Sequence, residues 1–396
     1  MDSQGEVISI TKASDDDNLL DSGGYHHHHH HHHRRQYYFP VTTVKIIILF
    51  VAVGLIYLVL NQSSYPPTQF FQRSSSFSLS SRPNESVTTS TLSSSTMQEN
   101  VRSQNLPSKV INEENKILED TLRKAVMKDK KTVIITTLNA AWTEPNSIFD
   151  LFVESFKIGN GTEKLLRHVV VATLDQKAHS RCLKARFLHC YTLTTQGVDF
   201  SGEAFFMSED YLKMMWRRID FLTTVLQMGF DFVFTDADVM WLRDPFEKFY
   251  PHVDFQIACD YYWFNSMDRN NSPNGGFNYV RSNNRTVQFY KFWYESRERF
   301  PGQHDQDVLN NIKFDPFIQD IGLEIRFLDT AHFGGFCEPS KDLDLVVTMH
   351  ANCCIGLGNK IHDIRMVIDD WKKYLSLSFN ERNLSSRSWT VPRICG

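Results

Sequence analysis

The segment FVFTDADVMWL, residues 232–242, places two carboxylates where they can act together. A buried strand that ends in Asp-x-Asp delivers Asp236 and Asp238 to the carboxyl edge of a sheet, which is where open α/β sheets bind their ligands. Hard oxygen ligands suit Mg²⁺ or Mn²⁺, which keep open positions for substrate phosphates. The pattern therefore predicts a divalent metal that holds a diphosphate, with a surface turn or a helix cap as the alternative.

Two residues near the carboxyl end of the chain can complete such a site. His350 ends an apolar run, and in this it resembles Asp238. His350 is therefore either a third metal ligand or a packed core histidine. Lys360 follows shortly after Gly356 and Gly358, and its ammonium can neutralise a diphosphate as a point charge.

Further polar residues each have a functional and a structural interpretation. Arg217 and Arg218 either form a solvated helix face or direct one guanidinium towards the aspartates. Asn274 is followed by two glycines, which let backbone approach a ligand or simply form a turn. Asp305 and Gln306 precede an amphipathic run, so they either cap a helix or accept hydrogen bonds from sugar hydroxyls.

The elements that must position these residues alternate between strand and helix, as in a doubly wound α/β domain. The runs TVIITTL and HVVVATL are continuous and β-branched, which is typical of parallel strands buried on both faces. Strands are predicted at 132–138, 168–174, 232–235, 255–259, 277–281, 323–328 and 345–350. Helices are predicted at 110–126, 144–157, 208–228, 285–299, 305–312 and 360–374.

The amino-terminal part of the chain has a different composition. Residues 41–60 are apolar except for Thr42, Thr43 and Lys45, and a helix of about 20 such residues spans a bilayer. Basic residues precede this span, and none follows it until Arg73, which predicts a cytosolic amino terminus. The polar stretch 61–107 cannot bury enough apolar surface to fold and is expected to be a disordered stem. We therefore expect a cytosolic tail at 1–40, a single-pass anchor at 41–60, a lumenal stem at 61–107 and a lumenal domain at 108–396.

Composition narrows the possible partners. The net charge is −4 and no basic stripe is present, so the sequence gives no indication of nucleic-acid binding. Seven cysteines in an oxidising lumen allow up to three disulfides with one thiol left over. Cys182 and Cys190 could close a short loop, but the pairing cannot be deduced from the sequence.

Taken together, these segments resemble the glycosyltransferases of GT-A type, and in particular glycosyltransferase family 77, the plant nucleotide-diphospho-sugar transferases. The resemblance runs from about residue 133 to residue 374. It is carried, in order, by TTLNAAW from Thr136, MMWRRIDFL from Met214, FTDADVMWLRDPF from Phe234, NGGFNYVRSN from Asn274, HDQDVLNN from His304 and MHANCCIGLGNK from Met349. It implies a Rossmann-like, mixed and mostly parallel sheet flanked by helices.

The retaining transferases of family 8 are similar in the order of their sites, and this likeness implies a role for each candidate residue. The implied ligands of Mn²⁺ (or Mg²⁺) are Asp236, Asp238 and His350, and Lys360 would bind the diphosphate. The implied nucleotide pocket consists of Thr136, Thr137 and Asn139, with Asp236 near the ribose. The implied catalytic and sugar-binding residues are Arg218, Asn274, Asp305 and Gln306.

The chain departs from the family 8 pattern at two places. The spacing between His350 and Lys360 is longer than in His-x-x-Gly-x-x-Lys. Asn274 is followed by two glycines rather than by Ser-Gly or Thr-Gly, which affects the expected sugar pocket.

The resemblance implies a metal-dependent, retaining glycosyltransferase that uses a nucleotide sugar such as UDP-arabinose, UDP-xylose or UDP-galactose. Its acceptor would be a cell-wall polysaccharide or glycoprotein, and its location the Golgi membrane in type II orientation. No carboxylate nucleophile is evident in the sequence, which favours a front-face reaction. A membrane-anchored, metal-dependent phosphohydrolase and an inactive nucleotide-sugar-binding scaffold are the alternatives, and the oligomeric state is left open.

Overall fold

A computed structural model describes residues 108–128, 131–193, 195, 198–378, 380–381 and 388–395. The expected tail, anchor and stem (1–40, 41–60 and 61–107) lie outside this part of the chain. Within the described part, no helix is both long enough and apolar enough to cross a bilayer.

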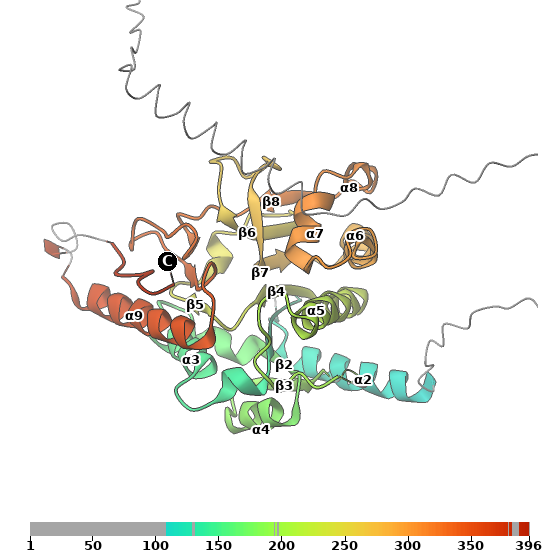
Figure 1. The fold of residues 1–396 in the computed structure, drawn as a ribbon, viewed down its shortest axis with the longest axis horizontal. Coiled ribbons are helices and arrows are strands. Elements are labelled where there is room, and N and C mark those ends of the chain that lie inside the picture. The colour runs from blue at the N-terminus through green and yellow to red at the C-terminus, as the bar shows by residue number, and fades with distance from the viewer. Residues whose placement is uncertain are drawn as a thin grey trace, which may run out of the picture. The chain divides into compact units, whose positions relative to one another are not determined.

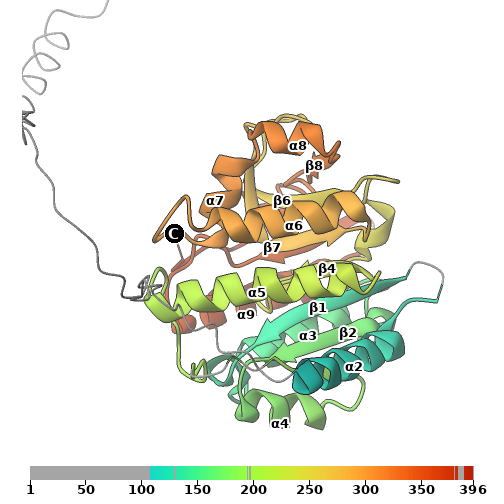
Figure 2. The same ribbon diagram turned by 90° about the vertical axis from the view of Figure 1, so that its right-hand side faces the viewer.

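A seven-stranded mixed sheet forms the centre of the domain (Figures 1 and 2). Its pairings are parallel except where β7 pairs with β4 and with β6, so a single strand runs against the others. The mostly parallel sheet predicted from the sequence is thereby confirmed. In spatial order the strands are β3 (His189–Thr192), β2 (Val169–Thr173), β1 (Thr132–Leu138), β4 (Asp231–Thr235), β7 (Ser272–Val280), β6 (Phe255–Tyr261) and β8 (Ile325–Phe327).

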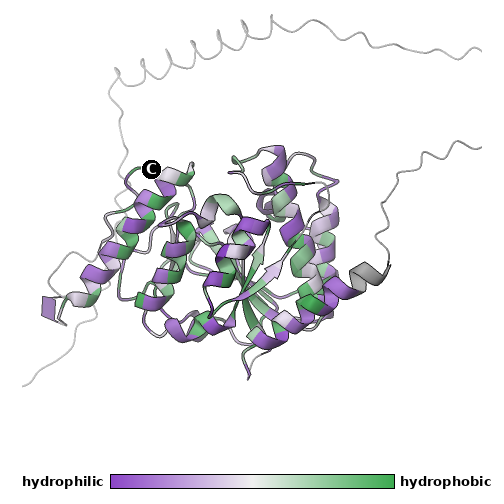
Figure 3. Ribbon diagram, turned by 90° about the horizontal axis from the view of Figure 1, so that it is seen from below, coloured by the Kyte–Doolittle hydropathy of each residue, from purple (hydrophilic) through white to green (hydrophobic). Residues whose placement is uncertain are grey.

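Both faces of this sheet are covered, which explains the uninterrupted apolar runs of its strands. Alternate residues of β1 enter different cores: Val133 and Ile135 pack on one face, and Ile134 and Leu138 on the other. Figure 3 shows mostly green strands at the centre and helices that alternate purple and green, as expected for helices with one buried side.

The helices divide between the two faces (Figure 2). The first face is covered by α2 (Ser108–Ala125), α5 (Glu209–Gln227), α6 (Asn284–Ser296), α7 (Asp305–Ile312) and the short α8 (Pro316–Asp320). The second is covered by α3 (Ile148–Ile158), α4 (Gln176–Lys184), α9 (Leu357–Ser376) and a small sheet of β5 (Val239–Trp241), β10 (Thr348–His350) and β9 (Phe333–Gly335). Short 3₁₀ turns lie at Ala140–Thr143, Glu163–His168 and Pro245–Glu247.

Several element boundaries differ from the sequence-based predictions. The helix predicted at 144–157 begins only at Ile148, because Glu144 precedes Pro145 and adopts an extended conformation (ψ 150°). Strand β7 begins at Ser272, ahead of the predicted 277, so Asn274 lies within a strand rather than in a turn. The strand predicted at 345–350 is reduced to Thr348–His350.

Three disulfides tie the described part of the chain together. They join Cys182 to Cys190, Cys337 to Cys353, and Cys354 to Cys395, and Cys259 is left as a buried thiol. The last two disulfides anchor the segment that follows His350, which lies at the functional site described next.

Candidate metal and sugar-nucleotide site

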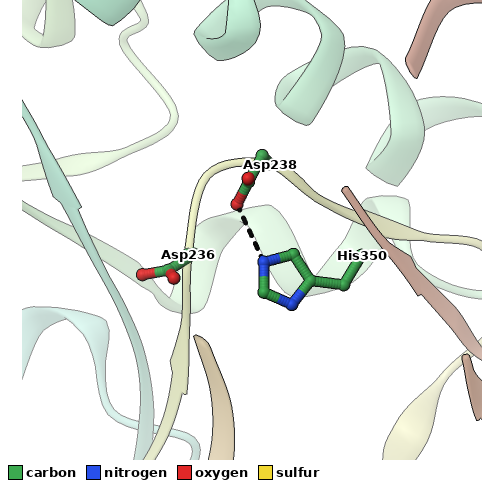
Figure 4. A group of neighbouring side chains, drawn as sticks. All are labelled: Asp236, Asp238 and His350. Atoms are coloured by element: carbon green, nitrogen blue, oxygen red, sulfur yellow. Dashed lines mark ion pairs between the residues drawn. The ribbon is translucent and has the colours of Figure 1, made fainter. Parts of the chain in front are cut away.

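Two aspartates and one histidine meet at the carboxyl end of β4 (Figure 4). Asp236 follows β4 directly, and Asp238 lies in the turn that leads into β5. The antiparallel pairing of β5 with β10 places His350 opposite Val239, and the backbone N–H of Ala351 donates to the carbonyl of Asp238. Residues more than a hundred positions apart in the sequence are thus brought together by strand pairing.

The cluster has the geometry and chemistry of a divalent-cation site. One ligand atom from each of Asp236, Asp238 and His350 lies within 4.8 Å of the others. Oδ1 of Asp238 is buried and accepts no hydrogen bond from the residues that the structure describes, although Nε2 of His350 lies 3.2 Å away. Two carboxylates and an imidazole suit Mn²⁺ or Mg²⁺, so these residues fit the implied metal.

Gly276 in β7 leaves the space that this cluster occupies. A Cβ atom there would lie 2.5 Å from Cε1 of His350 and 2.6 Å from Oδ2 of Asp236. The backbone carbonyl of Gly276 also accepts a hydrogen bond from the N–H of Asp236 at 2.7 Å. Only glycine allows the strand to approach the cluster this closely.

Two basic side chains, which come from different helices, contact the aspartates. Arg218 of α5 is buried and bridges Asp236 (2.9 Å) and Asp305 (2.5 Å). Nζ of Lys360, in the first turns of α9, lies 2.5 Å from Oδ2 of Asp238. The sequence left open whether Arg218 lies on a solvated face, and the structure shows that it points into the site.

These contacts shift the carboxyl pKa values in different directions. Burial raises the pKa of Asp236, and the Arg218 guanidinium offsets only part of that effect. Burial also acts on Asp238, but the Lys360 ammonium and the His350 imidazole outweigh it and hold its pKa below the ordinary value. For Asp305, Arg218 and His304 likewise outweigh burial and lower the pKa. Asp238 and Asp305 are therefore ionised at neutral pH.

A cavity of about 460 Å³ opens beside the cluster. It brings together most of the candidates from the sequence: Arg218, Asp236, Asn274, Asp305, Gln306, His350 and Lys360. Asp238 is 1% exposed and lies behind this surface, in contact with His350 and Lys360.

The three residues expected to form the nucleotide pocket do not line this cavity. Thr136 is buried in β1, Thr137 is half-buried, and neither is among the lining residues. The side-chain amide of Asn139 donates instead to the carbonyls of Phe200 (3.0 Å) and Gly202 (2.9 Å). Asn139 therefore holds the segment that leads into one wall of the cavity, at Glu203 to Phe206.

The cavity also contains residues that sequence analysis missed. Asp260 near the end of β6 and Asn352 after β10 contribute polar groups, and Phe205 and Phe206 contribute exposed aromatic side chains. Of these residues, only Asn352 could have been identified from the sequence, since it lies within the motif that begins at Met349.

A larger cavity of about 840 Å³ lies at the opposite edge of the sheet, beside Asp231, Asp254 and Arg281. Among the described residues, however, Asp236, Asp238 and His350 form the one group arranged to hold a metal ion. The candidate functional site is therefore the smaller cavity, at the carboxyl edge.

The protein has a mixed α/β fold with a candidate metal cluster and a cavity at the carboxyl edge of its central sheet. The model of the nucleotide-diphospho-sugar transferase family matches residues 164–364, about half of the chain. The chain belongs to the nucleotide-diphospho-sugar transferase family and is a glycosyltransferase.

Two proteins of Arabidopsis thaliana are similar to the chain over most of their length. Uncharacterized protein At4g15970 is 53% identical over 72% of this chain and 74% of its own. Uncharacterized protein At1g28695 is 41% identical over 70% of this chain and 87% of its own.

Solved structures share the fold only distantly. Mouse xyloside xylosyltransferase 1 is 11% identical with a TM-score of 0.34, over 56% of this chain and 98% of its own. The galactosyltransferase LgtC is 10% identical with a TM-score of 0.35, over 63% of this chain and 99% of its own. At these scores the likeness adds nothing to the assignment, which rests on the family.

Proposed function

We propose that this chain is a metal-dependent, retaining glycosyltransferase that moves a sugar from a UDP-sugar to a cell-wall polysaccharide or glycoprotein. The observation that carries the proposal is the cluster of Asp236, Asp238 and His350 beside a cavity of about 460 Å³. We further propose that the protein is anchored in the Golgi membrane in type II orientation, on the basis of residues 41–60 and the basic residues before them.

Asp236, Asp238 and His350 would hold Mn²⁺ or Mg²⁺, and the donor diphosphate would lie between them and Lys360. When bound, such a cation stabilises negative charge on the diphosphate as a Lewis acid. Because Lys360 already lies 2.5 Å from Asp238, its ammonium is within reach of a diphosphate bound beside that carboxylate.

The donor sugar would lie against Arg218, Asn274, Asp305 and Gln306. Arg218 holds Asp305 and Asp236 in one arrangement, so that two carboxylates from distant elements face the same cavity. Such preorganisation matters because a misplacement of about 1 Å at a reacting centre can reduce the rate about a hundredfold.

The reaction would proceed on the front face of the sugar. The bond between the anomeric carbon and the diphosphate oxygen breaks, the acceptor hydroxyl oxygen forms the new bond on the same face, and its proton passes to the leaving diphosphate. An acceptor glycan could stack on the side chains of Phe205 and Phe206, residues that are 70% and 59% exposed and line the cavity wall.

The test uses the detergent-solubilised full chain with UDP-arabinose, UDP-xylose and UDP-galactose and a panel of wall-glycan acceptors. We expect transfer with Mn²⁺, loss of transfer after chelation, and recovery when Mn²⁺ is restored. Proton NMR of the product reports the anomeric configuration. An unchanged rate in the chelated protein would reject metal dependence, and an inverted product would reject retention.

A further inference from the structure

The carboxylate of Asp260 accepts hydrogen bonds from three side-chain amides that come from three separate segments. Oδ1 accepts from Nδ2 of Asn274 at 2.8 Å and from Nδ2 of Asn352 at 2.7 Å. Oδ2 accepts from Nε2 of Gln306 at 2.8 Å. All four residues line the cavity.

The opposite end of each amide is held by a backbone N–H group. Oδ1 of Asn274 accepts from Gly276 at 2.9 Å, and Oε1 of Gln306 accepts from Gly275 at 2.9 Å. Oδ1 of Asn352 accepts from the backbone N–H of Cys337 at 3.2 Å. Each amide is therefore fixed at both its nitrogen and its oxygen.

This arrangement permits one orientation of all three amides. An ionised carboxylate only accepts hydrogen bonds, and a backbone N–H only donates them. If one amide turned over, its oxygen would face the Asp260 carboxylate and its NH₂ group would face an N–H group. Both contacts are repulsive, so the Asp260 carboxylate and the three backbone N–H groups together fix which way the amides point.

We propose that Asp260 is a positioning residue that sets the hydrogen-bonding pattern of the donor-sugar pocket. The inference rests on the proposed function, in which Asn274 and Gln306 contact the donor sugar. After their bonds to Asp260 and the glycines, each of these amides keeps one N–H proton and one oxygen lone pair, at positions that Asp260 has fixed. The sugar hydroxyls meet this fixed pattern, and the pattern favours sugars whose hydroxyls match it.

Substitution of Asp260 by asparagine keeps size and shape but breaks the pattern. The new NH₂ group must face an amide NH₂ of Asn274, Asn352 or Gln306. If Gln306 turns over to relieve that contact, it loses the hydrogen bond from Gly275. A lost or unsatisfied hydrogen bond of this kind corresponds to roughly a tenfold to hundredfold loss in sugar recognition.

The test measures binding of UDP, UDP-arabinose, UDP-xylose and UDP-galactose to the full chain in the presence of Mn²⁺. The quantity of interest is the gain in affinity of a UDP-sugar over UDP. We expect D260N to bind UDP as the wild type does and to lose roughly tenfold to a hundredfold of the sugar-dependent gain. If D260N keeps the full gain, the inference is wrong and the proposed function stands. If the wild type itself shows no gain for any of the sugars, the proposed function fails, and this inference fails with it.

A matched control separates positioning from stability. Asp254 lies just before β6, and Asp260 lies near the other end of the same strand. Asp254 also accepts several hydrogen bonds, but it does not line the cavity at the metal cluster. D254N should lower the melting temperature and keep the sugar-dependent gain. If D254N loses the same gain as D260N, a general loss of stability explains both variants and the inference is overturned.

The double variant D260N/Q306E keeps the test decisive if D260N folds poorly. The amide oxygen introduced at position 260 can accept from Asn274 and Asn352, and the new NH₂ group can donate to the carboxylate introduced at position 306. That carboxylate can still accept from the backbone N–H of Gly275. Every hydrogen bond and the net charge are preserved.

We expect this double variant to melt closer to the wild type than D260N and Q306E do, because Q306E alone sets two carboxylates face to face. A double variant that melts below both single variants would refute the network.

Discussion

Strands β4 and β6 run in the same direction, and each has an aspartate at or next to both of its ends. The aspartates at the amino ends have different hydrogen-bond partners, and so a different role, from those at the carboxyl ends. At the amino ends the carboxylates hold the chain in place. Asp231 accepts from the backbone N–H of Ser282 at 2.7 Å. Asp254 accepts from Nη2 of Arg285 (2.7 Å), from Nδ2 of Asn283 (2.8 Å) and from the backbone N–H of Glu324 (3.1 Å).

At the carboxyl ends the partners of the carboxylates are themselves part of the cavity. Asp236 contacts Arg218, and Asp260 contacts the amides of Asn274 and Gln306. At the amino ends the partners are backbone N–H groups, Arg285 and Asn283, none of which lies near the metal cluster, whereas the partners at the carboxyl ends line the cavity beside that cluster. The residue type is the same, and the partners decide whether it serves stability or binding.

The largest expected effect is that of D238N at the carboxyl edge. Loss of one metal-ligating carboxylate should reduce the transfer rate by about a thousandfold or more, since a bound cation contributes several kcal/mol to charge stabilisation. The checks are initial rates with saturating Mn²⁺ and Mn²⁺ binding by electron paramagnetic resonance. D231N is the control, because an asparagine oxygen can still accept from Ser282. Wild-type Mn²⁺ affinity in D238N would contradict the site.

A smaller loss is expected for G276A. Its Cβ would displace Asp236 or His350, which lie 2.6 and 2.5 Å from that position, and the rate should fall about a hundredfold. The matched control is G202A, since no atom lies within 4 Å of a Cβ at Gly202. Equal rates for the two variants would show that the close approach of β7 is not required.

At the amino edge the expected effect is on stability rather than on rate. D254N removes charge-assisted hydrogen bonds and leaves Arg285 to the solvent, so the free energy of unfolding should fall by about 2 kcal/mol. Denaturant titration measures this loss, and transfer assays should give the wild-type rate. A large loss of rate in D254N would show that the amino edge of the sheet also contributes to transfer, and not to stability alone.

The smallest effect is the pH dependence of that stability difference. Burial acts to raise the pKa of Asp254, but Arg285, the Glu324 backbone and Asn283 outweigh it and hold the pKa below its ordinary 3.8. A depressed folded-state pKa means that the carboxylate stabilises the fold above the unfolded-state pKa and loses this effect as the pH falls through the folded-state pKa. The difference in unfolding free energy between the wild type and D254N should therefore be constant near neutral pH and shrink in acid. A difference that grows in acid would contradict this assignment.

The sequence by itself determined the features that are written in local patterns. The apolar run before Asp236 specifies a buried strand, and the position of His350 at the end of another run places it at a strand end. Continuous β-branched segments specify a mostly parallel sheet with both faces covered. These inferences succeed because strand periodicity and burial are properties of consecutive residues.

Only the tertiary structure decided how the side chains at the carboxyl edge share their hydrogen bonds. Asp260 meets partners that are 14, 46 and 92 residues away, and no local pattern records such separations. The same holds for Asn139, whose side-chain amide donates to the carbonyls of Phe200 and Gly202, which are 61 and 63 residues away. A side chain's type limits what it can donate or accept, but the packing of distant strands and helices decides which partner it meets.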